Sequence, residues 1–239
     1  MRRLQRIDVV EVAELRPALH PYLTHDAAVT IRAIKRDVES LGGIFGVWSA
    51  LRLQEEQAQL RARWEAWNWW KKSGQGPQPP YQAYATKPGG SWHEAGRAVD
   101  FAVFKVVDGR RVSTLGFEAE PEDHLQLFWD IIRPYGWEPV IAKPTFNLEE
   151  CWHYEFRGPW KWAYERAGYR EAVKAAILDV GNCPDYQETQ FIQAQLMRLR
   201  VYMGRIDGVW GTKTETGLRA LGVSRQDAVE QLKTMEVAA

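Results

Sequence analysis

Two short stretches of this sequence carry side chains that are able to bind one metal ion together. The stretch SWHEAGRAVD offers the imidazole of His93 and the carboxylate of Asp100, and the later stretch ECWH offers a second imidazole, that of His153. Two histidines and one aspartate are enough for a catalytic zinc ion, which takes three protein ligands and keeps an open position for water. The carboxylate of Glu150, which precedes His153 in the second stretch, is then free to act as the base on that water.

The elements expected around these residues support a shared site. Residues 97–105, RAVDFAVFK, predict a strand because they are mostly β-branched, aromatic or small and contain no breaker. Alternation places Asp100 on a face that is otherwise apolar, and an ionised carboxylate buried there is costly unless it is paired or binds a metal. Residues 152–156, WHYEF, predict a second strand with His153 and Glu155 on one face. A buried His–Asp pair without any metal is the alternative that the residues alone leave open.

The two motifs, in this order, resemble those of the zinc peptidases that cut the stem peptides of peptidoglycan. The motif S-x-H-x-x-G-x-A-x-D occupies residues 91–100, E-x-W-H occupies residues 150–153, and the resemblance covers residues 25–160. That family includes D-alanyl-D-alanine carboxypeptidases of the VanY type and phage L-alanyl-D-glutamate endopeptidases. The resemblance implies that zinc is the cofactor. It implies that the metal ligands are His93, Asp100 and His153 and that the general base is Glu150.

Three further side chains near these motifs are weaker candidates for a role in the metal site. Glu149 competes with Glu150 for the role of base, but it lies one place off the family motif. Glu155 is expected to be a structural acid that orients a metal ligand. Cys151 stands between the base and the ligand, and it is not expected to bind the metal because the resembling family varies at this position.

A third motif concerns the substrate. The pattern S-x-L-R-x-x-x-E-Q, which begins at Ser49, also resembles this family, in which the arginine follows the first strand and faces the substrate. A guanidinium group matches a carboxylate bidentately, so it suits the free carboxylate of a stem peptide. The resemblance therefore implies substrate binding by Arg52, with Gln57 and Ser91 as further candidates. On the chemistry of the residues alone, an exposed helix start is the other interpretation.

Hydrophobic periodicity predicts the elements that must position these residues. In chain order they are a helix at 26–41 with Asp26 as its N-cap, a strand at 44–48, a helix at 57–70 with a stripe of tryptophans, a loop at 71–90, a hairpin at 106–112, and helices at 121–133 and 160–180. The resemblance implies an α+β fold, with a small antiparallel sheet and flanking helices, similar to the Hedgehog and DD-peptidase folds. We expect this catalytic domain to span residues 1–180.

Residues 185–239 predict a second, smaller domain. The helix expected at 187–199 is followed by the motif G-x-I-D-G-x-x-G-x-x-T, and two further helices are expected at 212–221 and 224–233. This order resembles the three-helix peptidoglycan-binding domain, which implies a C-terminal three-helix bundle that anchors the chain to the cell wall. The Asp207–Gly208 pair within the motif is expected to shape the turn and not to contact the ligand.

The composition excludes several classes of function. The 239-residue chain has 31 basic and 31 acidic side chains, so its formal net charge of zero gives no electrostatic case for a nucleic-acid partner. Two cysteines do not make a disulfide framework.

The first residues carry acids within their apolar part, which argues against a secretory signal, and no run is long enough to span a membrane. We therefore expect a monomer made in the cytoplasm that acts on the cell wall, after holin-type release if it is phage-encoded.

These patterns together predict a zinc-dependent metallopeptidase that hydrolyses the stem peptide of bacterial peptidoglycan. A wall-binding tail without an export signal favours a phage-type endolysin that cuts between L-Ala and D-Glu. A D-Ala-D-Ala carboxypeptidase uses the same metal site and is the alternative within this class. A non-catalytic cell-wall-binding protein with a purely structural metal is the alternative of another class.

Overall fold

The computed structural model describes residues 4–7, 20–107, 110–115, 122–142 and 150–236. The chain divides into two compact units, one that ends at Phe156 and one that begins at Arg157. The first unit carries the residues expected at the metal site, and the second carries the expected wall-binding tail. Among the described residues, no helix combines the length and the apolar character that a membrane crossing needs.

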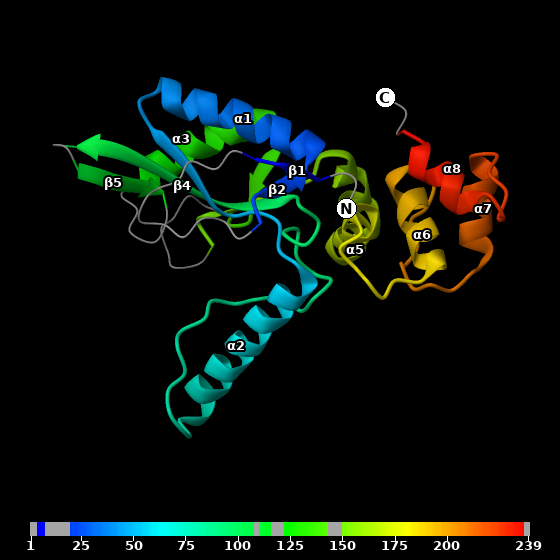
Figure 1. Cartoon of the computed structure of the whole chain (residues 1–239), viewed down its shortest axis with the longest axis horizontal. Helices are drawn as coiled ribbons and strands as arrows, with labels where there is room; N and C mark the ends of the chain where they lie inside the picture. Colours follow the sequence, from blue (N-terminus) through cyan, green and yellow to red (C-terminus); the bar gives the residue numbers. More distant parts are fainter. Residues whose placement is uncertain (1–3, 8–19, 108–109, 116–121, 143–149, 237–239) are drawn as a thin grey trace. The chain divides into compact units, whose positions relative to one another are not determined.

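A five-stranded antiparallel sheet forms the centre of the first unit (Figure 1). Its strands follow in the order β3 (Ile44–Ser49), β4 (Ala98–Val107), β7 (His153–Phe156) and β6 (Trp137–Pro139), and β5 (Arg110–Leu115) also pairs with β4. The strand predicted at residues 97–105 is therefore β4, with which β3, β5 and β7 all pair. The expected turn at Asp108 and Gly109 lies outside the described residues, and the strands before and after it pair with each other.

Two helices cover one face of this sheet and enclose an aromatic core. Helix α1 (His25–Ser40) contacts β3 and α3 (Glu122–Ile132), and α3 contacts β5 and β6. Figure 1 shows the two helices side by side. Phe101 of β4 is fully buried beneath them, and its ring contacts those of Phe45, Phe128, Trp137 and Tyr154. Because side chains alternate along a strand, Asp100 faces away from this core.

The start of α1 differs slightly from the expectation. The helix begins at His25, just after a short strand β2 (Tyr22–Thr24) that pairs with β1 (Leu4–Arg6). Thr24 occupies the N-cap position, so the assignment of Asp26 as N-cap is wrong. The carboxylate of Asp26 instead pairs with the guanidinium of Arg97 at 2.9 Å. This ion pair ties the first turn of the helix to the residue that precedes β4.

Helix α2 (Gln54–Ser73) projects away from the sheet, and Gln57 is the one buried residue in it. The helix includes the predicted segment at 57–70 and ends at Gly74, whose left-handed φ of 64° stops it. The loop that follows returns along the helix (Figure 1). Two tyrosines of this loop contact the tryptophan stripe edge-on, so the stripe packs against the loop and not against the sheet. We call the helix and its returning loop, residues 54–90, the arm.

The second unit contains five α-helices within its described residues: α4 (Lys161–Ala167), α5 (Tyr169–Val180), α6 (Glu188–Arg198), α7 (Thr212–Ala220) and α8 (Ala228–Thr234). The prediction of one continuous helix over 160–180 is wrong. Gly168 divides it, because its φ of 89° and ψ of 164° are not helical. In the tail, α7 and α8 both contact α6.

Helix α5 belongs to the same compact unit as the tail. It packs against α6, the carboxylate of Glu171 accepts a hydrogen bond from the Ile206 amide at 2.7 Å, and Gln195 donates to the Asp179 carboxylate at 2.9 Å. The compact unit therefore begins before the expected boundary between residues 180 and 185. The division of labour between a catalytic and a wall-binding domain stays a prediction.

Candidate metal centre

Two segments that are far apart in the sequence bring the expected metal ligands together. Asp100 lies on β4 and is the cross-strand partner of His153 at the start of β7. His93 comes from the tight turn before β4, in which the Gly96 amide donates to the His93 carbonyl at 3.0 Å and φ of Gly96 is 62°. Antiparallel register and this turn therefore place all three side chains on the sheet face opposite the aromatic core.

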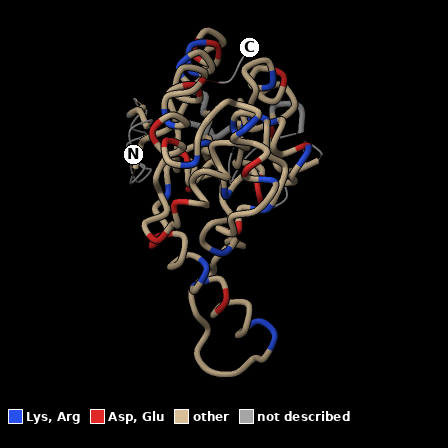
Figure 2. The backbone as a smooth tube through the Cα atoms, turned by 90° about the vertical axis from the view of Figure 1, so that its right-hand side faces the viewer, with Lys and Arg blue, Asp and Glu red and all other residues tan. Residues whose placement is uncertain are grey.

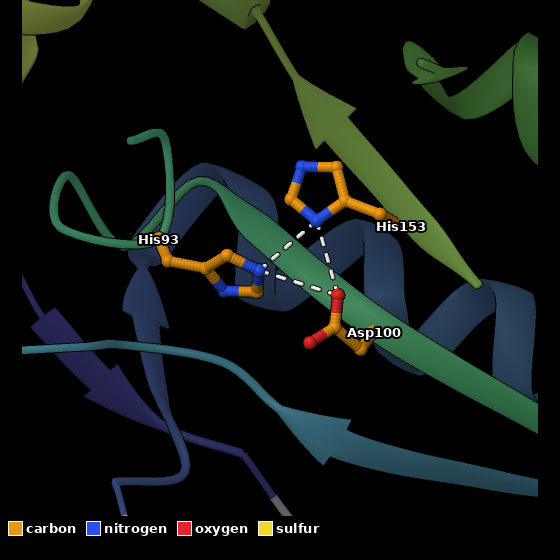
Figure 3. Close-up of side chains that lie close together, drawn as sticks. All are labelled: His93, Asp100 and His153. Atoms are coloured by element: carbon orange, nitrogen blue, oxygen red, sulfur yellow. Dashed lines mark hydrogen bonds and ion pairs between the residues drawn. The ribbon is translucent and has the colours of Figure 1, made fainter. Parts of the chain in front are cut away.

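The ligand atoms of these residues converge on one point, as Figure 3 shows. His93 Nε2 and His153 Nδ1 lie 3.0 Å apart, Asp100 Oδ1 lies 3.0 Å from His153 Nδ1, and it lies 3.3 Å from His93 Nε2. Atoms bound about 2.0–2.1 Å from a tetrahedral zinc ion are roughly 3.3 Å apart, which follows from the tetrahedral angle. The observed separations agree with that spacing to a few tenths of an ångström. The chain thus contains a group that can hold the expected zinc ion.

A backbone carbonyl fixes the orientation of His93. The Nδ1 atom of its ring lies 2.7 Å from the Ala50 carbonyl oxygen, which can only accept a hydrogen bond. Nδ1 therefore carries the proton, and the lone pair of Nε2 points towards Asp100 and His153. The side chain of His93 is 2% exposed, so neighbouring atoms hold the ring in this orientation.

Burial and mutual attraction set the protonation of the three ligands. Burial lowers the pKa of His93 to about 4 and outweighs the attraction of Asp100, so the ring is neutral near pH 7. Burial would raise the pKa of Asp100, but the two histidines hold it well below its usual range. Burial would also lower the pKa of His153, and its hydrogen bond to Asp100 reverses this shift. A neutral imidazole and an ionised carboxylate are the forms that a metal ion binds.

Glu150 lies at the start of the turn that leads into β7. Its φ of 64° is in the left-handed region, which is unusual for a residue with a side chain. Burial raises the pKa of its carboxyl above the ordinary value of 4.5, and the charges of His153, Asp100 and Arg52 also act on it. The carboxylate therefore shares the electrostatic environment of the ligand group, as a general base on a bound water must. Glu149 lies outside the described residues.

Arg52 is anchored beside the ligand group by several contacts. Its Nη2 atom lies 4.0 Å from Asp100 Oδ2, and its Nη1 atom donates to Gln57 Oε1 at 2.9 Å. The Arg52 amide donates to the His93 carbonyl at 3.1 Å, so the backbone is also fixed. The side chain is 18% exposed, which leaves part of the guanidinium open to a substrate.

The surroundings of Gln57 and Ser91 favour a supporting role in the site over direct contact with a substrate. Gln57 is fully buried, and its amide nitrogen donates to the Thr86 carbonyl at 2.7 Å while its oxygen accepts from Arg52. Ser91 is 7% exposed, and its hydroxyl oxygen accepts from the His93 amide at 3.3 Å. Gln57 therefore positions Arg52, and Ser91 helps to shape the turn that carries His93.

Glu94 is a supporting residue that the sequence reasoning missed. It is fully buried, and its carboxylate accepts hydrogen bonds from the amides of Gly89, Gly90 and Ser91 at 2.8, 3.2 and 3.0 Å. Burial raises the pKa of its carboxyl, and these three amides oppose that rise. The carboxylate thus closes the glycine loop that delivers the chain to His93. An acid four residues after two consecutive glycines was the only signal in the sequence.

Two other side chains near the second motif are buried but stand apart from the ligand group. Cys151 is 2% exposed, and among the described residues the group able to share an ion consists of two histidines and one aspartate without it. Glu155 is also 2% exposed. It follows His153 by two residues on β7, and its charge helps to raise the pKa of that histidine, which fits the structural role expected for it.

The arrangement has the parts that hydrolysis by a metal centre requires. Three ligands leave one position for water on a four-coordinate ion. Glu150 provides a carboxylate whose charge interacts with those of His153 and Asp100, and Arg52 provides a cation 4.0 Å from Asp100. A purely structural zinc site takes four protein ligands, and the described residues supply three in this group.

No protein-family model matches the sequence, and no curated protein matches it. The chain is similar to several solved structures, among them the following three. A mutant of the vancomycin-resistance D,D-pentapeptidase VanY in complex with Zn(II) overlaps with a TM-score of 0.39 at 17% identity, over 71% of this chain and 84% of that chain. VanYB in complex with D-alanine-D-alanine gives a TM-score of 0.39 at 17% identity, over 64% and 79%. The LD-carboxypeptidase LdcB gives 0.47 at 18% identity, over 66% and 69%. Because these identities and TM-scores are low, the function proposed for this chain rests on its own site residues.

Proposed function

We propose that this chain is a zinc-dependent peptidoglycan peptidase that hydrolyses the stem peptide of the bacterial cell wall. The observation that carries the proposal is the convergence of His93, Asp100 and His153 within 4.8 Å of one another, with the carboxylate of Glu150 in the same electrostatic environment. The motifs that contain these four residues resemble those of the stem-peptide peptidases, and the convergence of the three ligand residues supports the proposal.

The chain's own residues have distinct roles in the proposed reaction. His93, Asp100 and His153 would hold a zinc ion, which would supply Lewis acidity and lower the pKa of a bound water towards about 7. Glu150 accepts a proton from the attacking water and delivers it to the leaving amine. Arg52 binds a carboxylate of the substrate and so fixes the scissile bond relative to Glu150. Ala50 and Gln57 hold His93 and Arg52 in the orientations that these steps need.

The position of Arg52 suits two bonds of the stem peptide. In the D-Ala-D-Ala bond, the residue that leaves carries a free α-carboxylate. In the L-Ala–D-Glu bond, the D-Glu is linked through its γ-carboxyl, so its α-carboxylate is also free. We propose the L-Ala–D-Glu bond, as in a phage-type endolysin, and the D-Ala-D-Ala bond is the second candidate.

One substrate distinguishes these candidates. The N-acetylated pentapeptide L-Ala-D-γ-Glu-L-Lys-D-Ala-D-Ala contains both bonds, and mass spectrometry of its products identifies the one that is cut. We expect release of N-acetyl-L-Ala, abolished by a chelator and restored by zinc. Release of terminal D-Ala would support the carboxypeptidase. No cleavage of this peptide or of purified sacculi by zinc-loaded protein would refute the proposal and favour a wall-binding protein with a structural metal.

We further propose that the tail holds the enzyme on the cell wall. Its motif resembles that of the peptidoglycan-binding domain, and binding of an insoluble polymer raises the local concentration of the catalytic unit without adding chemistry. Co-sedimentation of the full chain with purified sacculi, in the presence of a chelator, measures this binding separately from turnover. A full chain that stays in the supernatant would contradict this role.

A further inference from the structure

The arm, residues 54–90, is an aromatic structure that the proposed chemistry does not use. A helix of 20 residues is about 30 Å long, and all but one of its residues are at least partly exposed. A surface helix that packs on a core normally buries a broad apolar stripe. Helix α2 instead presents its apolar residues to its own returning loop and to solvent.

The returning loop is fixed along the helix by four successive contacts. Trp67 contacts Tyr81 with ring centroids 5.2 Å apart, and Trp64 contacts Tyr84 at 5.0 Å. Nearer the sheet, the Ala85 carbonyl accepts a hydrogen bond from Arg61 at 3.0 Å, and the Thr86 carbonyl accepts one from Gln57 at 2.7 Å. The arm is therefore a defined two-layer structure and not a loose insertion.

Large aromatic surfaces on the arm are open to solvent. Tyr81 and Tyr84 are each 62% exposed on the loop side of the arm, and Trp69, two residues after Trp67, is 56% exposed on the other side of α2. The two tyrosines meet their tryptophans at interplanar angles of 89° and 83°, an edge-on geometry that leaves ring surface uncovered. Single, scattered apolar residues are normal on a protein surface, whereas clusters of exposed aromatic residues mark interaction sites.

The arm is continuous with the metal centre at both of its ends. At its start, Gln57 hydrogen-bonds Arg52, which lies beside Asp100. At its end, Glu94 holds the amides of Gly89, Gly90 and Ser91, and the metal ligand His93 comes two residues after Ser91. A polymer whose cleavable peptide lies at the metal ligands is thereby positioned to extend along the arm.

The chemistry of the arm fits a polysaccharide that bears anionic groups. The negative face of an aromatic ring attracts the weakly positive C–H groups on the face of a sugar ring. The arm also carries five basic and three acidic side chains, whereas the whole chain is formally neutral. Lys71 and Lys72 lie in the last turn of α2, at the far end of the arm (Figure 2). These cations suit the carboxylates of a peptidoglycan strand.

We infer that the arm binds the glycan strand of peptidoglycan next to the stem peptide that is cut. This inference rests on the proposed function and adds to it a polymeric substrate: the enzyme recognises the sugar chain and not the peptide alone. Tyr81 and Tyr84, packed against Trp67 and Trp64, provide the stacking surface. Arg52 and the metal ligands act on the peptide, so the two sets of residues are separable by experiment.

The test compares a polymeric substrate with a sugar-free one. The double variant Tyr81→Ala and Tyr84→Ala is assayed on purified sacculi and on the N-acetylated pentapeptide. Two stacking contacts, each worth at least a factor of about 2, multiply to a rise of at least about fourfold in the half-saturating concentration of sacculi. We expect turnover of the pentapeptide to stay within about twofold of wild type. Leu127→Ala is the matched control, because Leu127 of α3 is 54% exposed and lies off the arm.

Each other outcome overturns the inference. An unchanged half-saturating concentration of sacculi would show that the arm does not bind the substrate. An equal loss of activity on the pentapeptide would show that the arm belongs to the peptide site. Binding of wild-type protein to phosphatidylglycerol vesicles, lost in the double variant while sacculi are still bound, would show that the arm binds membranes. If the double variant unfolds, the single variant Tyr81→Ala is used, with an expected rise of at least about twofold. Failure of zinc-loaded wild-type protein to cut either the pentapeptide or purified sacculi would instead refute the proposed function.

Discussion

Replacement of Glu150 should separate catalysis from folding, because this residue combines a proposed chemical role with an unfavourable backbone. Its φ of 64° is left-handed, which costs a residue with a side chain about 1–2 kcal/mol. Glycine avoids this cost but loses roughly 0.5–1 kcal/mol more backbone entropy on folding. We therefore expect Glu150→Gly to raise the free energy of unfolding by about 0.5–1 kcal/mol, the difference between these two terms. Glu150→Gln keeps the backbone cost and should leave stability unchanged.

Both variants should lose turnover while they keep the metal. Loss of a general base typically lowers kcat by about 10²–10⁴-fold, and His93, Asp100 and His153 are untouched. The assays are cleavage of the pentapeptide, zinc content after dialysis, and urea unfolding. Arg200→Gly is the matched control, because Arg200 is the other described non-glycine residue with a left-handed φ, at 65°. It should gain stability in the same way without any loss of activity.

The result that would refute this reasoning is specific. If Glu150→Gln retained more than about a tenth of wild-type kcat, another group would be the base, since a general base contributes at least about 10². Glu149→Gln, tested in parallel, would then be expected to lose the activity. If Glu150→Gly were less stable than wild type while Arg200→Gly was more stable, the backbone argument would fail at this site alone.

Three further predictions concern the surroundings of the site. Glu94→Ala removes the acceptor of three loop amides and should weaken zinc binding by roughly 10–100-fold, measured by chelator competition; an unchanged affinity would contradict its positioning role. Burial would raise the pKa of Asp26, but Arg97 holds it below its ordinary value of 3.8, so its contribution to stability is present above that pH and lost as pH falls through the lowered pKa. Urea unfolding between pH 6 and 2 should therefore show a steeper acid loss in wild type than in Asp26→Asn, and parallel curves would exclude this pair as a cause. Removal of residues 157–239 should leave a more soluble first unit than removal of residues 185–239, because the second cut exposes the face of α5 that packs on α6; sedimentation of the two fragments decides this.

The sequence by itself determined the chemistry that was possible and most of the local structure. The β-branched, aromatic and small residues at 97–105 predicted β4, and alternation along that strand placed Asp100 on the face opposite Phe101. Amphipathic spacing and glycine stops predicted α1, α3 and α6, because these signals act within a few residues of each other. The residue types of the two motifs limited the metal group to two imidazoles and one carboxylate, and the structure places those three side chains together.

Only the tertiary structure decided how those residues are held. The carbonyl of Ala50 orients His93, and a backbone group has no signature in the sequence. Gln57 positions Arg52, and Glu94 closes the glycine loop, because the chain brings them to these partners through turns whose angles no periodicity encodes. The break at Gly168 and the grouping of α5 with the tail depend on packing between helices. Local sequence determines which side chains are available and which segments form helices or strands. Strand register and helix packing determine which of those side chains come into contact.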